Sequence, residues 1–415
     1  MIARLWLVGC VVAAALLVAC EPPRGSGMPE YVLPTATSGE IVAPSPTVSP
    51  TAADVMTETM TPLPETMVAG DNDDWESLVK RALQAQNLFV YSDSARALTS
   101  LANMAVAYPG LDATGRVMSG PELCAAVAEG GATHQRQADL VLTSGAACLQ
   151  ALVNAGELTP YLPATLLPTL SEDMLEPVLT HHWEVLGLHQ NDRLGEEQVL
   201  LSWWDLVSPA WRGAVALADP LVDEHAQGFL DALIAHEPEL RASYRGQMGD
   251  EALADAPAWA VWLRGVAAND LRILPSDAEV ARWVGDLAAE EGRAGICSSV
   301  HWERVSRGDL RLRLVQDAMP TAGVRWRTFV APAADAANAD GAKLGLLWLM
   351  GDETGRGGYE PWYQAGLYPA RLDVPLAAGT VPRSELVGRL WEVPLTPDTA
   401  LRAEAVELLA AARGE

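Results

Sequence analysis

The chain has 415 residues, of which 54 are acidic and 28 are basic, and its formal net charge is −26. The basic residues form no dense patch that could release counterions from a phosphate backbone, so the composition argues against nucleic acid as a partner. The length is sufficient for two ordinary lobes.

The first residues of the chain predict an export signal. Arg4 precedes an apolar stretch, 5–19, that is too short to span a bilayer comfortably. Leu17-Val18-Ala19-Cys20 resembles a bacterial lipobox, which implies that Cys20 is lipidated and becomes the first mature residue. We therefore expect residues 1–19 to be a lipoprotein signal peptide. The alternative is a plain signal peptide with an incidental cysteine.

Residues 20–73, which begin with the lipidated cysteine, predict a tether. The segment 21–73 contains nine Pro, eight Thr and no Lys, with few large apolar side chains. Such a segment cannot bury enough surface to offset the entropy of ordering it, so we expect it to be disordered. No later run approaches the roughly 20 apolar residues of a spanning helix. We expect a lipid-anchored protein at the cell membrane that faces outside the cytoplasm.

Helical and strand patterns alternate in the rest of the chain. Apolar residues recur at helical spacing in some segments, and short dry runs bounded by polar turns separate these segments. The first patterns predict a helix from Trp75 with Asp74 as its cap, a strand at 88–91, a helix ended by Tyr108-Pro109-Gly110, a strand at 138–145 and a helix from Ala146 to about Ala155.

Three later segments each place a dry strand before a polar turn, at 213–220, 271–279 and 292–299. In the second of them, Ser276 and Glu279 have the spacing of a capping box. Strands alternating with helices predict an α/β fold with mostly parallel sheets, and dry strands indicate sheets that are covered on both faces. In such sheets the ligand lies beyond the carboxyl ends of the strands, where these polar turns are found.

The candidate ligand-binding residues lie in these turns. Hydroxyl groups and helix-starting amides suit anionic or oxygen-rich ligands. Asp93 would repel an anion but could bind an amine, so a cationic or zwitterionic ligand is an alternative. A further alternative is that each serine only caps its own helix. The candidates are Ser92, Asp93, Ser94, Thr143, Ser144, Ser276, Ser298 and Ser299, with His301 as a candidate metal ligand.

The sequence WWDLVSPAWRGAVALADP, at 203–220, resembles a segment of bacterial extracellular solute-binding proteins of ABC transporters, and it is most similar to the ferric-iron-binding branch. The resemblance implies a small helix at Trp203–Val207, packing by Trp204 or Trp211, and a turn at Gly213. Further segments resemble the landmarks of that family in the same order, at 88–94, 138–163, 272–296, 342–355 and 366–375.

The resemblance implies a type 2 periplasmic-binding-protein fold. In this α/β fold two lobes, each a mostly parallel sheet flanked by helices, are joined by crossover strands and close on a ligand by a hinge movement. The implied boundaries are 74–185 for the first part of lobe 1, 186–305 for lobe 2, and 306–415 for the return to lobe 1 and the C-terminal helices.

The function implied by the resemblance is that of a monomeric, lipid-anchored receptor that captures a small solute and delivers it to an ABC permease. No enzymatic activity and no cofactor are expected, apart from a possible bound metal ion. The chain has no G-x-S-x-G elbow and no G-x-x-x-x-G-K loop, and His236-Glu237 lacks the second histidine of a zinc-protease motif. The alternatives are a sensor or docking lipoprotein that kept the fold, and a tethered extracellular enzyme.

Two departures from the family concern the ligand site. In the iron-binding branch adjacent tyrosines follow the strand that here reads AGIC, whereas this chain has Cys297-Ser298-Ser299 there. The solute is therefore expected to be a metal ion, a small oxyanion or an organic ion, without a tyrosine pair. The segment 183–198 looks shortened and polar, which predicts an abbreviated crossover strand. His181 and His182 are adjacent, and we expect them to be solvated or partly packed.

The cysteines beyond the tether are Cys124, Cys148 and Cys297, and no CxxC motif is present. An exported protein can oxidise one pair, and we expect the pair to be Cys124 with Cys148.

Overall fold

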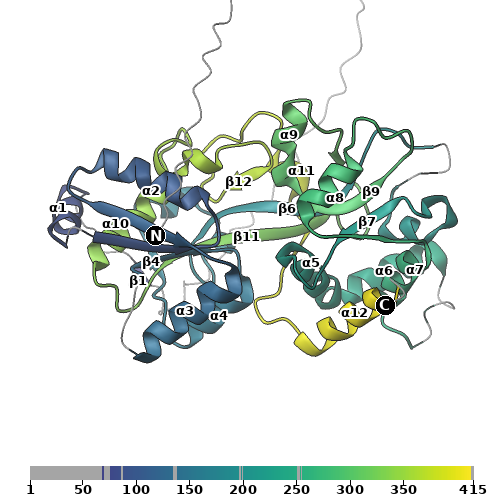
Figure 1. The fold of residues 1–415 in the computed structure, drawn as a ribbon, viewed down its shortest axis with the longest axis horizontal. Helices are drawn as coiled ribbons and strands as arrows, with labels where there is room; N and C mark the ends of the chain where they lie inside the picture. The colour runs from purple at the N-terminus through teal and green to yellow at the C-terminus, as the bar shows by residue number, and fades with distance from the viewer. Residues whose placement is uncertain are drawn as a thin grey trace, which may run out of the picture. The chain divides into compact units, whose positions relative to one another are not determined.

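The computed structural model describes residues 68–69, 75–85, 87–133, 138–195, 198, 200–249, 253 and 255–412 (Figure 1). The predicted signal peptide 1–19, the lipidation site Cys20 and the cap Asp74 lie outside these residues, and so does the tether 20–73 apart from Val68–Ala69 (β1). This short strand pairs in parallel with Tyr161–Leu162 (β5).

One mixed sheet runs through the described chain. Its strand order is β3-β2-β4-β11-β6-β9-β7-β8. The outer groups β3-β2-β4 and β9-β7-β8 are parallel, whereas β11 and β6 are antiparallel to each other and to their neighbours β4 and β9 in this order. The strands are β2 Asn87–Ser92, β3 Asp112–Val117, β4 Leu140–Thr143, β6 Thr180–Gln190, β7 Val215–Ala218, β8 Arg272–Leu274, β9 Ala294–Ser298 and β11 Gly323–Pro332.

Two short strands, β10 Arg313–Leu314 and β12 Leu367–Pro369, pair with β6, and a third, β13 Leu390–Glu392, pairs with β11. The parallel groups confirm the predicted α/β fold. Figure 1 shows the long strands β6 and β11 passing through the middle of the folded part, between the two groups of helices.

Helices cover the sheet in both lobes. In the first lobe they are α1 Trp75–Ala85, α2 Arg96–Ala107, α3 Gly120–Thr133, α4 Ala146–Asn154 and α10 Ala339–Leu349. In the second lobe they are α5 Glu224–Ala235, α6 Glu237–Met248, α7 Ala258–Ala268, α8 Asp277–Val284 and α12 Thr399–Ala412. Short helices are α9 Trp302–Ser306 and α11 Arg383–Leu386, with the 3₁₀ turns η3 Trp203–Val207, η6 Ser299–His301 and η7 Gly357–Trp362. None of the helices in the described chain combines the length and the apolar character that spanning a bilayer needs.

Each lobe has apolar cores on both faces of its strands. In β7, Val215 and Leu217 belong to one core, and Ala216 and Ala218 belong to another. This alternation confirms the prediction that the dry strands belong to a sheet covered on both faces. The segment 306–415 contributes to both lobes. Its elements α10 and β12 pack in the first lobe, while α12 packs against α5 and α7 in the second.

Near its end the chain crosses between the lobes a third time. Leu386 belongs to the core of the first lobe, and Trp391 belongs to the core of the second. The crossing at 386–391 is therefore short, and it lies beside β11, with which β13 pairs.

The tryptophan-rich turn packs as the resemblance implies. The turn η3 occupies 203–207, and Trp203, Trp204 and Trp211 are all buried. The Trp262 Nε1 atom donates to the Trp203 carbonyl oxygen at 2.9 Å, which ties the turn to α7. These indoles are core side chains of the second lobe.

The prediction of an abbreviated crossover strand at 183–198 was wrong. The strand β6 has 11 residues, all of them buried, and it pairs with β11 and β9 along its two edges. His181 and His182 are also buried, contrary to the expectation of a solvated or partly packed pair. A shift in the pairing with β11 leaves His181 as the extra residue of a bulge, so the two adjacent rings approach each other, with 2.7 Å between their Nδ1 atoms.

His181 is stabilised by a backbone contact, 2.8 Å from its Nε2 atom to the Leu349 carbonyl oxygen. Burial lowers the pKa of His181 to about 4, so the ring is neutral at pH 7. Most polar residues of β6 thus find partners inside the fold, although the buried Thr180 hydroxyl has none among the described residues. For this reason their polarity was a poor guide to exposure.

At Gly213 the effect of backbone strain can be measured without a steric clash of the new side chain. The φ of Gly213 is +70°, and a Cβ atom at this position would meet no heavy atom within 4 Å. We expect Gly213→Ala to lower the free energy of unfolding by about 1 kcal/mol through the left-handed backbone alone. The matched control is Gly246→Ala in α6, which is equally open but helical, and which should stabilise the protein by about 0.5 kcal/mol or more. Urea denaturation of both variants would measure the effects, and equal signs would contradict the assignment.

Candidate functional site

A cavity of about 350 Å³, called the cleft below, lies where the two lobes meet the central strands. The first lobe supplies residues that follow the carboxyl ends of β2, β3 and β4, and the second lobe supplies the first turn of α5. The central strands β6 and β11 form its floor. The polar residues that line the cleft are Asp93, Ser94, Arg96, Ser119, Ser144, His182, Glu184, Glu224, His225 and Thr328.

A larger cavity of about 570 Å³ lies beside β10. Half of its lining residues are aliphatic, including Leu200, Leu312 and Val315, and it contains none of the ligand residues predicted from the sequence. We take the smaller cleft as the candidate site because it joins strand-end turns of the first lobe to charged residues of the second.

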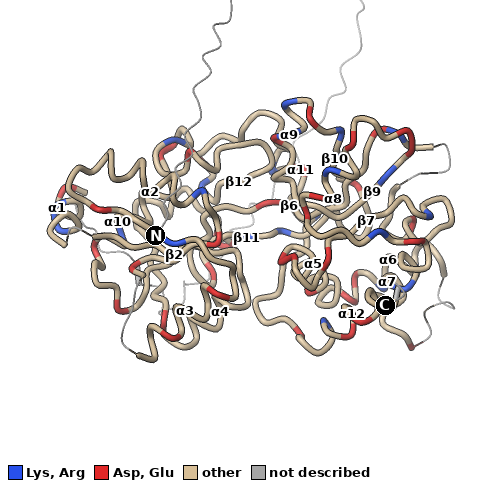
Figure 2. The backbone as a smooth tube through the Cα atoms, in the orientation of Figure 1, with Lys and Arg blue, Asp and Glu red and all other residues tan. Residues whose placement is uncertain are grey.

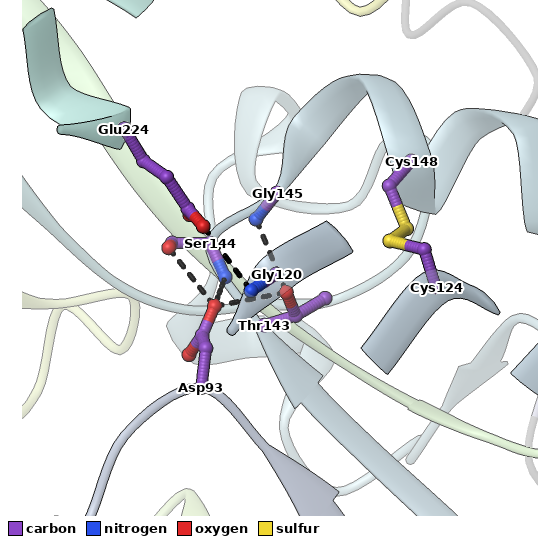
Figure 3. The surroundings of a disulfide bond; sticks show 8 residues. All are labelled: Asp93, Gly120, Cys124, Thr143, Ser144, Gly145, Cys148 and Glu224. Carbon is purple, nitrogen blue, oxygen red and sulfur yellow. Dashed lines mark hydrogen bonds between the residues drawn. A yellow bond between two sulfur atoms is a disulfide. The ribbon is translucent and has the colours of Figure 1, made fainter. Parts of the chain in front are cut away.

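Asp93 organises the first-lobe side of the cleft. Its Oδ2 atom accepts hydrogen bonds from the Ser144 backbone N–H at 2.6 Å, from the Ser144 hydroxyl at 3.0 Å and from the Thr143 hydroxyl at 2.9 Å (Figure 3). Burial raises the pKa of Asp93, and these hydrogen bonds oppose the shift. The donors that would suit a bound anion at this turn are therefore used by a carboxylate of the protein itself.

Glu224 reaches the first lobe from the second. It is the first residue of α5, and its Oε1 atom accepts from the Gly120 backbone N–H at 3.1 Å, at the start of α3 (Figure 3). Burial and the nearby charge of Asp93 raise the pKa of Glu224. The hydrogen bonds that the structure shows for Asp93 and Glu224 come from neutral N–H and O–H groups. Two acidic side chains thus face the cleft with no hydrogen-bonded cationic partner among the described contacts.

Glu184, by contrast, has a cationic partner. Glu184 lies on β6 and is 3.1 Å from the His225 Nε2 atom, and it also accepts a hydrogen bond from the Ser298 hydroxyl. The charge of Glu184 also acts on Arg96. Burial alone would lower the pKa of His225, but the hydrogen bond and charge of Glu184, together with Asp277 and Asp223, raise it to about 10. His225 is therefore a cation at neutral pH.

Three of the sequence-predicted residues, Asp93, Ser94 and Ser144, line the cleft directly. Thr143 donates to Asp93 and Ser298 donates to Glu184. Each of them therefore contacts a residue that lines the cleft but does not line it directly. These five residues come from the ends of three strands that are well separated in the sequence.

The other predicted residues have partners within the protein. The Ser92 hydroxyl accepts from the Ser94 N–H at 3.0 Å. The Ser276 hydroxyl caps α8 by accepting from the Glu279 N–H, although the Glu279 carboxylate pairs with Arg282 instead of completing a capping box. The Ser299 hydroxyl donates to the Gly366 carbonyl oxygen.

His301, the candidate metal ligand, forms a 2.7 Å contact with Asp277. Within the described ranges, no three His, Cys, Asp or Glu side chains are grouped so that they could hold a metal ion.

Sequence reasoning missed several residues of the cleft. Glu224 and His225 follow the strand-end turn after β7, so the rule that selected Ser144 could also have found them. Arg96 opens α2 directly after the first turn, and the same signal was available for it. Glu184 and Trp326 lie inside long central strands, where no local pattern marks them.

The predicted disulfide supports this site. Cys124 on α3 and Cys148 on α4 are bonded, which confirms the expected pair, and Cys297 is a buried free cysteine. The bond joins α3, four residues after its first residue Gly120, to the first turn of α4, which begins two residues after Ser144 (Figure 3).

Charged residues of both signs are distributed over the described chain. Figure 2 shows short segments of Lys and Arg and of Asp and Glu, separated by uncharged residues, on both sides of the central strands. This distribution agrees with the lack of a dense basic run in the sequence.

No family model and no curated protein matches the sequence. Solved structures do match it. The chain is similar to iron-bound HitA from Pseudomonas aeruginosa at 19% identity and a TM-score of 0.55, covering 79% of this chain and 98% of that one. It is also similar to the Bordetella ferric binding protein, at 22% identity and a TM-score of 0.54, with 79% and 99% covered.

A third similar structure is the substrate-binding protein of an ABC transporter from Agrobacterium tumefaciens. It has 14% identity and a TM-score of 0.57, with 79% of this chain and 94% of that chain covered. These neighbours are binding proteins whose fold was implied by the resemblance in the sequence. The chain therefore has the α/β, two-lobed fold of the type 2 periplasmic-binding proteins.

Proposed function

We propose that the protein is a solute-binding protein of an ABC importer that captures a small organic ion in the cleft outside the cytoplasm. A lipid on Cys20 would hold it at the membrane, and residues 20–73 would form the tether. The fold that the chain shares with solute-binding proteins of known structure supports this role. A permease in the membrane would receive the solute.

The observation that carries the proposal is the construction of the cleft from both lobes. Glu224 on α5 hydrogen-bonds to Gly120 on α3, so side chains of the two lobes meet across the cleft. A solute between them would be enclosed when the lobes close and released when they separate. Closure also strengthens charge interactions within the cleft because it removes water.

The charges favour an organic cation, or a zwitterion whose ammonium group lies near Asp93 and Glu224. These two carboxylates are hydrogen-bonded to neutral groups, whereas the cation His225 is already paired with Glu184. Trp326 and Trp362 also line the cleft, and indole faces attract organic cations.

The two other solute classes have less support. The hydroxyls of Ser298 and Ser299 are bound to protein oxygens, and the Ser144 donors are bound to Asp93. Several similar structures, including iron-bound HitA and the Bordetella ferric binding protein, are of iron-binding proteins, so a metal ion is included in the test. His301, the metal ligand proposed from the sequence, is paired with Asp277.

A thermal-denaturation screen tests the ligand class. We expect small ammonium ions such as choline, methylammonium and alkyl diamines to stabilise the mature protein, by about 2.7 kcal/mol at a hundredfold excess over the dissociation constant. Asp93→Asn and Glu224→Gln should each weaken this binding about tenfold, because a charge-assisted contact contributes about 1.5 kcal/mol or more. Calorimetric titration gives the affinities.

Ser276→Ala is the matched control, because it removes the cap of α8 outside the cleft. This variant should lose stability and keep its affinity. Stabilisation by ferric citrate or phosphate in place of ammonium ions would contradict the proposed ligand class. If Asp93→Asn and Glu224→Gln both kept the ammonium affinity of the wild type, the binding site would lie elsewhere in the protein.

The anchor and the transport role need separate measurements in cells. Metabolic labelling with a fatty-acid analogue should mark the wild type and leave Cys20→Ala unlabelled, and the variant should leave the membrane fraction. Deletion of the protein together with a neighbouring permease should reduce uptake of the identified solute. A labelled Cys20→Ala variant would contradict the lipidation site.

A further inference from the structure

A further cavity, of about 280 Å³, adjoins the cleft. We call it the apolar cavity. Its walls are formed by the starts of α3 and α4, by one face of α5, and by Val393 and Pro394, which precede α12. The Cys124–Cys148 disulfide is part of the wall on the first-lobe side.

Small and apolar residues dominate this wall. Gly145, Ala146 and Ala147 line it at the start of α4, and Gly228 lines it on α5. At Gly228 a Cβ atom would lie 2.0 Å from the Trp326 ring, so the missing side chain lets the indole pack against α5. The cavity is thus suited to an alkyl or aromatic group rather than to a hydrated ion.

Asp231 is an acidic residue in this mostly apolar wall. The residue is 6% exposed, and its Oδ2 atom accepts from Arg402 on α12 at 2.9 Å. Its Oδ1 atom is buried and has no hydrogen-bond partner. Burial, only partly offset by Arg402, raises the pKa of Asp231 to about 6. Asp231 lines the cavity, so its carboxylate would attract a donor group of a ligand that enters it.

The apolar cavity and the cleft share three lining residues, Gly120, Glu224 and Trp326. The Glu224 side chain, with its hydrogen bond to Gly120, stands at the boundary between them. A ligand whose cationic end contacts Glu224 in the cleft could therefore extend past this side chain into the apolar cavity.

We propose that the apolar cavity is a second ligand compartment, and that the solute is an organic cation whose apolar arm enters it and ends in a hydrogen-bond donor to Asp231. The inference rests on the proposed function and narrows its ligand to a molecule of two parts. The cationic end lies between Asp93 and Glu224, the arm lies against Trp326 and the small residues of α4, and the far donor contacts the Asp231 carboxylate.

A series of amines tests the compartment with calorimetric titration of the mature protein. The probes are methylamine, butylamine, hexylamine and 1,6-diaminohexane. We expect the affinity to rise by up to about fourfold for each methylene group that enters the cavity. The diamine should bind more tightly than hexylamine because only the diamine has a donor for Asp231.

Two variants separate the compartment from the cleft. Ala147→Trp, at an exposed position on the rim, should fill the cavity and remove the gain from the longer arms while methylamine binding stays unchanged. Asp231→Asn should weaken the diamine more than hexylamine. Ala151→Trp is the matched control, because this position is exposed on α4 and does not line the cavity.

The outcomes distinguish the two proposals. If all the amines bind equally in every variant, the cleft binds ammonium but the apolar cavity is no compartment, and the inference is wrong. If no amine binds, or if Asp93→Asn has no effect on any of them, the proposed function fails first. A length-dependent gain that Ala147→Trp removes and Ala151→Trp keeps would establish the compartment.

Discussion

Glu184→Gln is expected to lower the free energy of unfolding by about 3 kcal/mol, because it removes the buried carboxylate of a partly buried ion pair. Glu184 is 8% exposed, and it contacts His225 and Ser298. The glutamine keeps the volume of the side chain and removes its charge, so two partly buried cations, Arg96 and His225, lose a carboxylate near them. Guanidinium denaturation monitored by tryptophan fluorescence measures the loss.

The loss should depend on pH. The pKa of His225 in the folded protein is about 10, above its ordinary value of 6.5. The contribution of the Glu184–His225 pair is therefore fully present below pH 6.5 and is lost as the pH rises through 10. The difference between wild type and Glu184→Gln should be largest near pH 6.5 and should shrink towards pH 10.

The control for this experiment is Glu360→Gln. Glu360 pairs with Arg356 at the surface, where the two side chains are 50% and 62% exposed, and such a pair contributes about 0.5 kcal/mol or less. If Glu184→Gln cost no more than this control, or if its cost were the same at both pH values, the role assigned to Glu184 would be refuted.

Removing the disulfide is the second change with a large expected effect. The bond closes a loop across a sequence separation of 24 residues, and the loss of such a cross-link costs about 3 kcal/mol in the chain-entropy description. We expect the double variant Cys124→Ala/Cys148→Ala to lose this amount. The variant should also bind ammonium probes more weakly, because the bond fixes the starts of α3 and α4 beside Gly120 and Ser144.

Reduced wild type provides an independent comparison. After treatment with dithiothreitol its stability should match that of the double variant, whereas reduction should leave the double variant unchanged. Cys297 is buried and unbonded, so Cys297→Ala should not respond to reduction differently from wild type. A double variant within 1 kcal/mol of oxidised wild type would contradict the predicted contribution.

The parts of the fold that could be predicted are those specified locally. The dry strand at 88–91 corresponds to β2, the tryptophan turn corresponds to η3, and Ser276 caps α8. In each case the signal is a short run of apolar residues or a capping side chain, and its physical cause lies within a few residues of it.

The central strands could not be predicted in this way. β6 carries His181, His182 and Glu184, which read as polar in the sequence, yet β11 and β9 cover both of its edges. Their partners, such as His225 and the Leu349 carbonyl oxygen, are far away along the chain. Six of the fifteen residues that line the cleft come from these strands and from α5, so local patterns identified mainly its first-lobe side.

The third crossing between the lobes limits how far they can separate. Leu386 and Trp391 are anchored in different cores, and five residue steps of fully extended chain reach at most about 18 Å. The ladder between β6 and β11 resists sliding but allows bending. The opening movement that the proposed function requires would therefore be a rotation that bends all three connections together, with the short one setting its maximum angle. Lengthening 386–391 by inserted glycines would then widen the open state, which small-angle scattering could detect as a larger radius of gyration.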